Sequence, residues 1–244
     1  MKRRFIKVVT VTGADDSVKP EDLSSIARKD PIIEFGILLS KRQRGHKRFP
    51  SEVWLEKLYR VWSHTGINLS GHLCGQWVSD LLVGKPTFFE EFGSIWRMFK
   101  RIQLNFHAQT NIAVNMLKLP GLLREYFFDT PIIFQIDGVN DEIFHQMKIG
   151  TDLSVFPLYD KSGGIGLLPD EWPKQHPNQY SGYAGGLSPD NLEVEIEKIS
   201  KAASRILPIW IDAETLLRSK DDTLFDLEKV LLFLKAAKPY TLTR

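Results

Sequence analysis

The sequence predicts a single-domain α/β protein, a (β/α)8 TIM barrel formed by all 244 residues. Short apolar runs of strand length alternate with segments of helical period along the whole chain. Strands separated by amphipathic helices pair in parallel, because each connection has to cross back over the sheet. Eight such units in about 250 residues close most simply into a barrel, and an open doubly wound sheet is the alternative.

Eight apolar runs, several of them rich in β-branched residues, are the expected strands. They are residues 5–12, 32–39, 68–73, 101–106, 131–136, 153–159, 180–184 and 206–211. Residues 84–97, with three phenylalanines and one tryptophan, interrupt the alternation and are expected to be an insertion or an extra helix.

The expected helices follow from apolar stripes and from start signals such as N-cap residues. They are residues 21–28, a helix from Ser51, residues 75–82, 111–126 and 141–147, a helix with Ser188 as N-cap and Pro189 at its first position, and a last helix from the capping-box pattern of Thr223 and Asp226.

Composition limits the class of protein. Hydrophobic residues make up 43% and charged residues 25%, as in ordinary globular proteins, and the net charge of +2 predicts neither nucleic acid nor an anionic membrane as partner. Cys74 is the only cysteine, which fits a reducing compartment, and no run approaches the roughly 20 apolar residues of a membrane helix. We expect a cytoplasmic protein, a monomer or a homodimer.

The stretch 158–172 is the first candidate site. An apolar strand ends in Asp160, and a turn with Gly163, Gly164 and Gly166 follows. A strand fixes the carboxylate, and glycines let backbone N–H groups approach a ligand closely. The alternative is a surface turn whose aspartate caps the next helix.

The carboxyl ends of barrel strands carry the reactive groups of such enzymes. Polar or glycine residues at the expected strand ends are Thr10, Thr12, His72, Asn105, His107, Asp137, Asp160, Gly185, Gly186, Asp212 and Glu214. Gly185 and Gly186 precede a helix, where backbone N–H groups and the helix dipole favour an anion such as phosphate. The alternative is a tight turn that needs glycine for its geometry alone.

Three further features have two interpretations each. Asp137 is a candidate general base, or the first residue of an Asx-turn. The basic run 41–48 is a mobile loop that closes on an acidic substrate, or a solvated loop. The side chains of His72, Cys74 and His107 are metal ligands, or they line a polar pocket or pack in the core. Their spacing matches no recognised metal-ligand pattern, so no metal site is expected.

Four segments resemble motifs of the phosphoribosylanthranilate isomerase family, in the same order. They are residues 160–166 with Trp172, residues 184–191 (Ala-Gly-Gly-Leu-Ser-Pro-Asp-Asn), residues 47–51 and residues 103–105. The resemblance implies an Amadori-type rearrangement of a phosphoribosylated aromatic amine, a step of tryptophan biosynthesis that uses a phosphorylated small-molecule substrate and no cofactor.

The resemblance also implies roles. Asp160 corresponds to the general acid, Arg48 belongs to the loop that engages the anthranilate end, and the turn of Gly185 and Gly186 holds the phosphate. The other candidate substrate-binding residues are Asn105, Gly163, Gly164, Asp212 and Glu214.

The chain departs from the family pattern at two strand ends. In a gapless alignment Thr10 occupies the position of the first-strand cysteine that acts as general base, and a threonine hydroxyl is a poor base without an activator. Glu214 places a negative charge where phosphate is expected. Two alternatives follow: a diverged barrel that acts on another sugar phosphate or acidic molecule through Asp137 or Glu214, and a ligand-binding homologue without turnover.

Overall fold

The computed structural model of the chain describes residues 2–105, 114–115, 117–127, 129–138, 140–150 and 152–242. Eight parallel strands follow one another around a closed barrel, and β8 pairs with β1. They are β1 Ile6–Thr12, β2 Ile33–Ser40, β3 Leu69–Cys74, β4 Arg101–Leu104, β5 Ile132–Ile136, β6 Val155–Tyr159, β7 Ser181–Ala184 and β8 Ile209–Ala213. The predicted (β/α)8 fold is confirmed.

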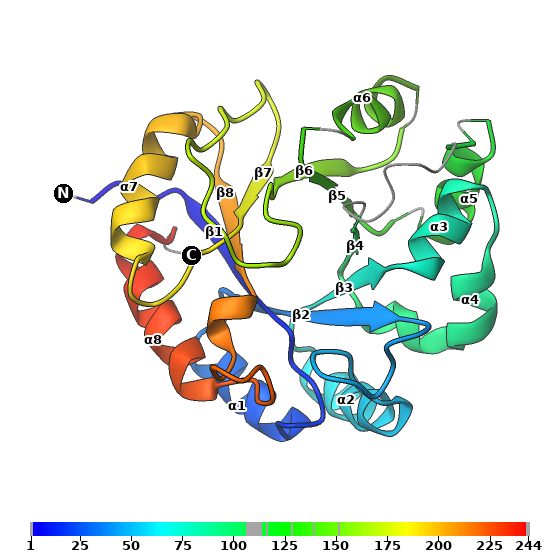
Figure 1. Cartoon of the computed structure of the whole chain (residues 1–244), viewed down its shortest axis with the longest axis horizontal. Helices are drawn as coiled ribbons and strands as arrows, with labels where there is room; N and C mark the ends of the chain where they lie inside the picture. The colour runs from blue at the N-terminus through cyan, green and yellow to red at the C-terminus, as the bar shows by residue number, and fades with distance from the viewer. Residues whose placement is uncertain are drawn as a thin grey trace.

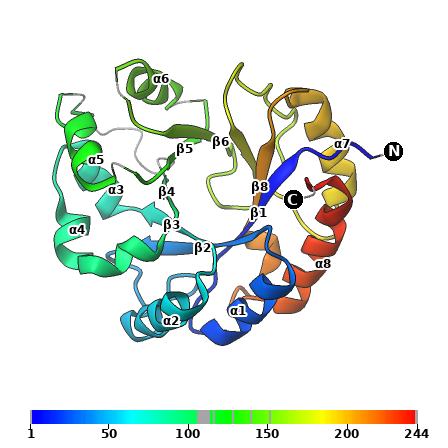
Figure 2. The same cartoon turned by 180° about the vertical axis from the view of Figure 1, so that it is seen from behind.

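Helices form an outer ring around the strands, which Figure 1 and the opposite view in Figure 2 both show. They are α1 Pro20–Lys29, α2 Glu52–Thr65, α3 Gln76–Leu82, α4 Thr87–Phe92, α5 Leu119–Phe127, α6 Asp141–Gly150, α7 Leu192–Ala202 and α8 Leu227–Ala237, with the 3-10 helices η1 Gly93–Met98, η2 Thr215–Leu217 and η3 Lys238–Tyr240. No helix in the described ranges is long and apolar enough to cross a bilayer.

Residues 84–97 contribute the extra elements α4 and η1 between β3 and β4. The phenylalanines of this stretch pack on one another and on Trp77, so its aromatic side chains form part of the outer core. Of the expected helix 111–126, residues 111–113 and 116 lie outside the described ranges. Residues 114, 115, 117 and 118 are not helical, so α5 begins only at Leu119.

Two helix starts differ from the prediction. Helix α7 begins at Leu192, because Ser188 and Asn191 exchange hydrogen bonds that close a turn before the helix: Ser188 N–H donates to Asn191 Oδ1, and Asn191 N–H donates to Ser188 Oγ. Helix α8 begins after Asp226, whose carboxylate accepts from the N–H groups of Glu228 and Lys229. Thr223 is therefore not its N-cap.

The connection from β6 to β7 contains no helix, although eight complete strand-helix units were expected. Residues 160–180 instead run as an irregular segment between α6 and α7 (Figure 1). Its aromatic residue Trp172 packs edge-on against Tyr183 and donates its indole N–H to Glu195 of α7 at 2.8 Å. The segment is thereby held on the barrel without a helix.

Apolar burial is divided between two regions. The larger cluster fills the space between strands and helices, as expected for parallel strands covered by helices. A smaller cluster inside the barrel contains Ile133, Leu158, Ala184 and Trp210. Gly182 makes room for the indole, because a Cβ at this position would lie 2.1 Å from Cε2 of Trp210.

A buried ion pair lies inside the barrel beside Trp210. The guanidinium of Arg101 binds both carboxylate oxygens of Glu34, donates to Thr10 Oγ1 at 3.2 Å, and lies 4.7 Å from the Trp210 ring centroid. Thr10 Oγ1 also donates to Glu34 at 3.1 Å. The Thr10 hydroxyl is thus committed to this ion pair.

Replacing one member of the pair is expected to destabilise the fold. Glu34→Gln leaves the Arg101 charge buried without its counter-charge, which costs about 3–5 kcal/mol of unfolding free energy. Urea unfolding measures the change. The matched control is Glu193→Gln, which breaks an exposed contact with Lys2 and should leave the urea midpoint nearly unchanged. Equal effects of the two substitutions would contradict a structural role for the buried pair.

Candidate active site

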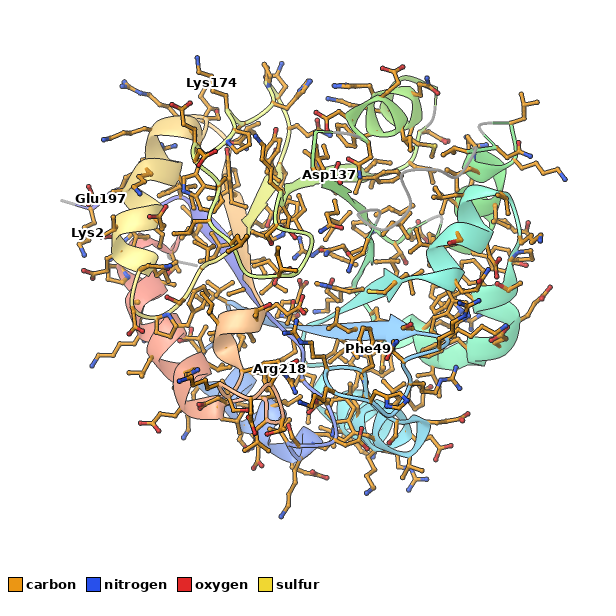
Figure 3. The ribbon with its side chains drawn as sticks, viewed as in Figure 1. Lys2, Phe49, Asp137, Lys174, Glu197 and Arg218 are labelled. Atoms are coloured by element: carbon orange, nitrogen blue, oxygen red, sulfur yellow. The ribbon has the colours of Figure 1, made fainter. Side chains whose placement is uncertain are left out.

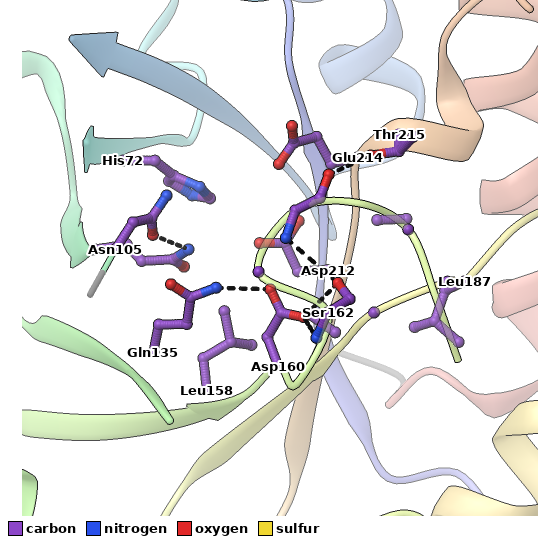
Figure 4. Close-up of a pocket in the computed structure, with 18 of the residues that line it drawn as sticks. His72, Asn105, Gln135, Leu158, Asp160, Ser162, Leu187, Asp212, Glu214 and Thr215 are labelled. Carbon is purple, nitrogen blue, oxygen red and sulfur yellow. Dashed lines mark hydrogen bonds between the residues drawn. The ribbon is translucent and has the colours of Figure 1, made fainter. Parts of the chain in front are cut away.

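A cavity of about 190 Å³ opens at the carboxyl ends of the strands. Its lining includes the carboxyl groups of Asp160, Asp212 and Glu214, and among the described residues no lysine or arginine lines it. Figure 4 shows these acids facing polar side chains from β3, β4 and β5. Because parallel barrel strands deliver their carboxyl ends to one rim, residues far apart in sequence meet here.

Asp160 follows β6 and is nearly fully buried. Its Oδ2 accepts from Gln135 Nε2 at 2.8 Å, and its Oδ1 accepts from the N–H and the hydroxyl of Ser162 at 2.9 and 2.7 Å (Figure 4). The three donors come from two neighbouring strand ends. They fix the orientation of the carboxylate at the cavity wall.

Asp212 near the end of β8 has different surroundings. Its Oδ1 accepts a single side-chain hydrogen bond, from Thr12 Oγ1 at 2.7 Å. Burial raises the pKa of Asp212 well above its usual range, the Thr12 hydroxyl opposes this shift, and the charges of Glu214, Glu34 and Asp160 add to it. Asp212 therefore keeps its proton to a higher pH than an ordinary aspartate does.

The turn of Gly185 and Gly186 lies against Asp160. Both glycines have positive φ angles, 104° and 66°. A Cβ on Gly185 would lie 3.2 Å from Asp160 Oδ1, and a Cβ on Gly186 would lie 2.5 Å from the backbone nitrogen of Leu168. Glycine is thus required both by the backbone conformation and by the close approach of the β6–β7 segment.

Arg48 does not line the cavity, because its guanidinium is held behind Glu214. Its Nη1 donates to Glu214 Oε1 at 2.8 Å and its Nε donates to Asp222 at 2.8 Å. Burial raises the pKa of Glu214, and the Arg48 charge opposes that shift. The positive charge of Arg48 therefore balances the negative charge of Glu214, a residue of the protein, and is not directed at a ligand in the cavity.

A second arginine anchors the same loops. Arg218, whose side chain is fully buried, donates to Asp15 at 2.7 Å, to Asp222 at 2.6 Å and to the carbonyl oxygen of Gly13. These contacts join the ends of β1 and β8. They fix the position of Asp222, and through it the position of Arg48.

The opposite side of the cavity is polar and uncharged. The side chains on this side are those of His72 on β3, Gln103 on β4, Asn105 immediately after β4, and Gln135 on β5. Burial lowers the pKa of His72 to about 3, and the nearby Arg101 charge acts in the same direction, so the imidazole is neutral. This side offers hydrogen bonds and no positive charge.

The structure brings most of the sequence-predicted residues together. Those that line the cavity are Asn105, Asp160, Gly163, Gly164, Gly185, Gly186, Asp212 and Glu214. Thr10, Arg48 and Asp137 do not line it. Asp137 lies in the turn between β5 and α6, labelled in Figure 3, and its Oδ1 accepts from the N–H of Asn140, three residues further on, at 3.2 Å.

Several cavity residues were not predicted from the sequence. They are Gln135 and Ser162, which hold Asp160. Of the two threonines expected at the end of the first strand, Thr12 contacts the cavity residue Asp212, although it does not itself line the cavity. The signal for Gln135 is a single polar residue within an apolar strand, at the alternate position that faces the barrel interior. His107 lies outside the described ranges. Within them, no group of three His, Cys, Asp or Glu residues is arranged to hold a metal ion.

The chain is similar in structure to solved barrel enzymes. Phosphoribosyl anthranilate isomerase from Thermotoga maritima matches with a TM-score of 0.54 and 14% identity over 98% of this chain and 100% of that one. TrpF from Jonesia denitrificans matches with a TM-score of 0.59 and 15% identity over 97% and 99%. A truncated 3-deoxy-D-arabino-heptulosonate 7-phosphate synthase from Thermotoga maritima matches with 0.53 and 12% over 98% and 89%.

No protein-family model and no curated protein sequence matches the chain. These structural matches are below 25% identity and therefore show a shared (β/α)8 fold. One further match, with a TM-score of 0.54 and 13% identity over 98% of this chain and 100% of that one, is a phosphoribosyl anthranilate isomerase in complex with reduced 1-(o-carboxyphenylamino)-1-deoxyribulose 5-phosphate.

Proposed function

We propose that the chain catalyses an Amadori-type isomerisation, in which an N-substituted ribosylamine phosphate becomes a 1-amino-1-deoxyribulose phosphate. The observation that carries the proposal is the pair of carboxyl groups in one cavity with contrasting surroundings. Asp212 is buried with a raised pKa, whereas Asp160 accepts three hydrogen bonds. Such a contrast separates an acid from a base within one site.

The two carboxyl groups account for every proton in the reaction. Asp212 donates its proton to the ring oxygen while the C1–O bond breaks and the nitrogen lone pair forms a C1=N bond. The carboxylate of Asp160 then removes the proton from C2, and the electron pair forms an enamine. Asp160 then returns its proton to C1 while the Asp212 carboxylate takes the C2 hydroxyl proton, which gives the ketone and restores both carboxyl groups. The reaction therefore needs no redox cofactor.

This assignment gives Asp160 the role of base, whereas the resemblance to the isomerase family gives it the role of acid. The reason is its environment, because all of its contacts come from donors. The missing first-strand cysteine is consistent with such an exchange of roles. Neither Thr10 nor Asp137 takes part in the proposal, because neither lines the cavity.

The turn of Gly185 and Gly186 supports a phosphorylated substrate. It lies beside Asp160, and its two glycines let backbone N–H groups approach an anion closely, although α7 begins only at Leu192. The structural similarity to phosphoribosyl anthranilate isomerases is consistent with a phosphate at this position. Arg48 reduces the repulsion from Glu214 by pairing with it.

Glu214 favours a second candidate, the same isomerisation of an unphosphorylated amino sugar. Its carboxyl group lines the same cavity as the glycine turn, and the lining described contains no basic side chain. A dianion would meet a like charge there unless Glu214 is neutralised. A direct comparison of phosphorylated and unphosphorylated substrates separates the two candidates.

The test follows turnover by mass spectrometry with substrates formed in solution from an aromatic amine and either ribose 5-phosphate or ribose. Formation of the 1-amino-1-deoxyribulose 5-phosphate only with enzyme supports the first candidate, and a preference for ribose supports the second. If neither amino sugar is converted, with anthranilate or with 2-aminobenzyl alcohol as the amine, the isomerase proposal fails.

A further inference from the structure

The uncharged side of the cavity contains three buried polar atoms without a hydrogen-bond partner among the described residues. They are His72 Nε2, Gln103 Oε1 and Gln135 Oε1. The three side chains belong to residues that are 1%, 4% and 4% exposed, and all three line the cavity. Buried polar atoms are almost always hydrogen-bonded in proteins, so a cluster of unpaired ones around a cavity indicates contacts that a ligand completes.

The orientation of the two glutamine amides follows from their neighbours. The Gln135 NH2 group donates to the Asp160 carboxylate, so its Oε1 points elsewhere as an acceptor. The Gln103 NH2 group donates to Asn105 Oδ1 at 2.9 Å, and Asn105 Nδ2 donates to Cys74 Sγ at 3.1 Å.

The thiol of Cys74 fixes the Asn105 amide in turn. Burial raises the pKa of Cys74 to about 12, so the thiol is neutral, and its hydrogen is directed to the carbonyl oxygen of His72. Its sulfur is then left to accept from Asn105. Both glutamine oxygens are therefore acceptors that need a donor.

A carboxylate would find no positive charge on this side. His72 is neutral, and Arg48, which the family resemblance places in the loop that engages the anthranilate end, is held by Glu214 and Asp222 and does not line the cavity. An anion would instead meet two amide oxygens. Burying a charge next to acceptors costs far more than burying a hydroxyl that donates to them.

We propose that the β3–β4–β5 side of the cavity binds a neutral hydrogen-bond donor of the substrate, a hydroxyl group received by Gln103 and Gln135, and discriminates against a carboxylate at the same position. The inference rests on the proposed function, which places the sugar phosphate at Asp160 and Gly185 and so directs the amine substituent to this side. The inference predicts that the amine attached to the ribose phosphate carries a hydroxyl group, whereas anthranilate carries a carboxylate.

Two matched probes test the discrimination by calorimetric titration. One is reduced 1-(o-carboxyphenylamino)-1-deoxyribulose 5-phosphate, and the other is the same molecule with a hydroxymethyl group in place of the carboxylate. We expect the hydroxymethyl probe to bind about tenfold to a hundredfold more tightly. Equal binding, or tighter binding of the carboxylate, overturns the inference but leaves the proposed function standing. Binding of neither probe rejects both.

A variant locates the contact. Gln103→Leu keeps the side-chain size but removes the acceptor, so it should weaken binding of the hydroxymethyl probe and reduce the preference to about twofold or less. The control, Gln146→Leu, makes the same change at an exposed helical position and should keep the full preference. A full preference in a folded Gln103→Leu protein would show that the amide is not the discriminating group. If Gln103→Leu does not fold, the wild-type comparison of the two probes decides the inference.

Discussion

Asp160→Asn is expected to lower kcat for the amino sugar phosphate by about 10²–10⁴-fold. The substitution keeps the shape of the side chain but removes the basic oxygen that would take the C2 proton. Binding of the reduced product analogue should change much less, because Gly185, Gly186 and the uncharged side of the cavity remain. The measurement pairs initial rates with calorimetric titration, so that a loss of proton transfer is distinguished from a loss of binding.

The matched control is Asp170→Asn, the same change at an exposed position of the same β6–β7 segment. It should leave kcat within about twofold, since exposed substitutions away from a site are nearly neutral. Thermal unfolding of both variants checks that each is folded. Full activity of a folded Asp160→Asn protein would remove Asp160 from the chemistry.

The barrel was predictable from the sequence because its signal is repeated along the chain. Parallel strands covered by helices are almost wholly apolar, and β2 is buried over its entire length. Segments at element boundaries carry a weaker signal. The α7 start shows this, since Ser188 followed by Pro189 is a usual N-cap pattern, but the two side-chain hydrogen bonds with Asn191 form a separate turn first.

The positions of the strand ends predicted most of the residues that line the cavity. They did not predict the hydrogen-bond and ion-pair partners of each carboxylate. Arg48 lies on the expected loop, yet it pairs with Glu214 and Asp222, residues about 170 positions further along the chain. No local pattern encodes such a contact. Thr10 illustrates a related problem, because both Thr10 and Thr12 face the barrel interior, and only the packing around Arg101 and Asp212 shows which one lies next to the cavity.

Asp212→Asn is expected to have opposite effects on activity and on stability. The amide cannot donate the proton that opens the sugar ring, so kcat should fall by about 10²–10⁴-fold. In the wild type, kcat should decrease as the pH rises through the raised pKa of Asp212, because the protonated acid is lost. A wild-type kcat that is constant from about pH 5 to about pH 9 would contradict the role of Asp212 as acid.

The stability effect has a definite sign. The folded protein holds the Asp212 proton more tightly than the unfolded chain does, so unfolding releases it and wild-type stability falls as the pH rises above the ordinary aspartate pKa of about 3.9. The amide introduced by Asp212→Asn stays neutral and still offers an oxygen to Thr12, so the variant should gain in Tm relative to the wild type as the pH increases. Asp170→Asn should show no such trend. A buried acid that lowers stability at neutral pH is explained by its use in catalysis, since a neutral amide would fill the same position without that cost.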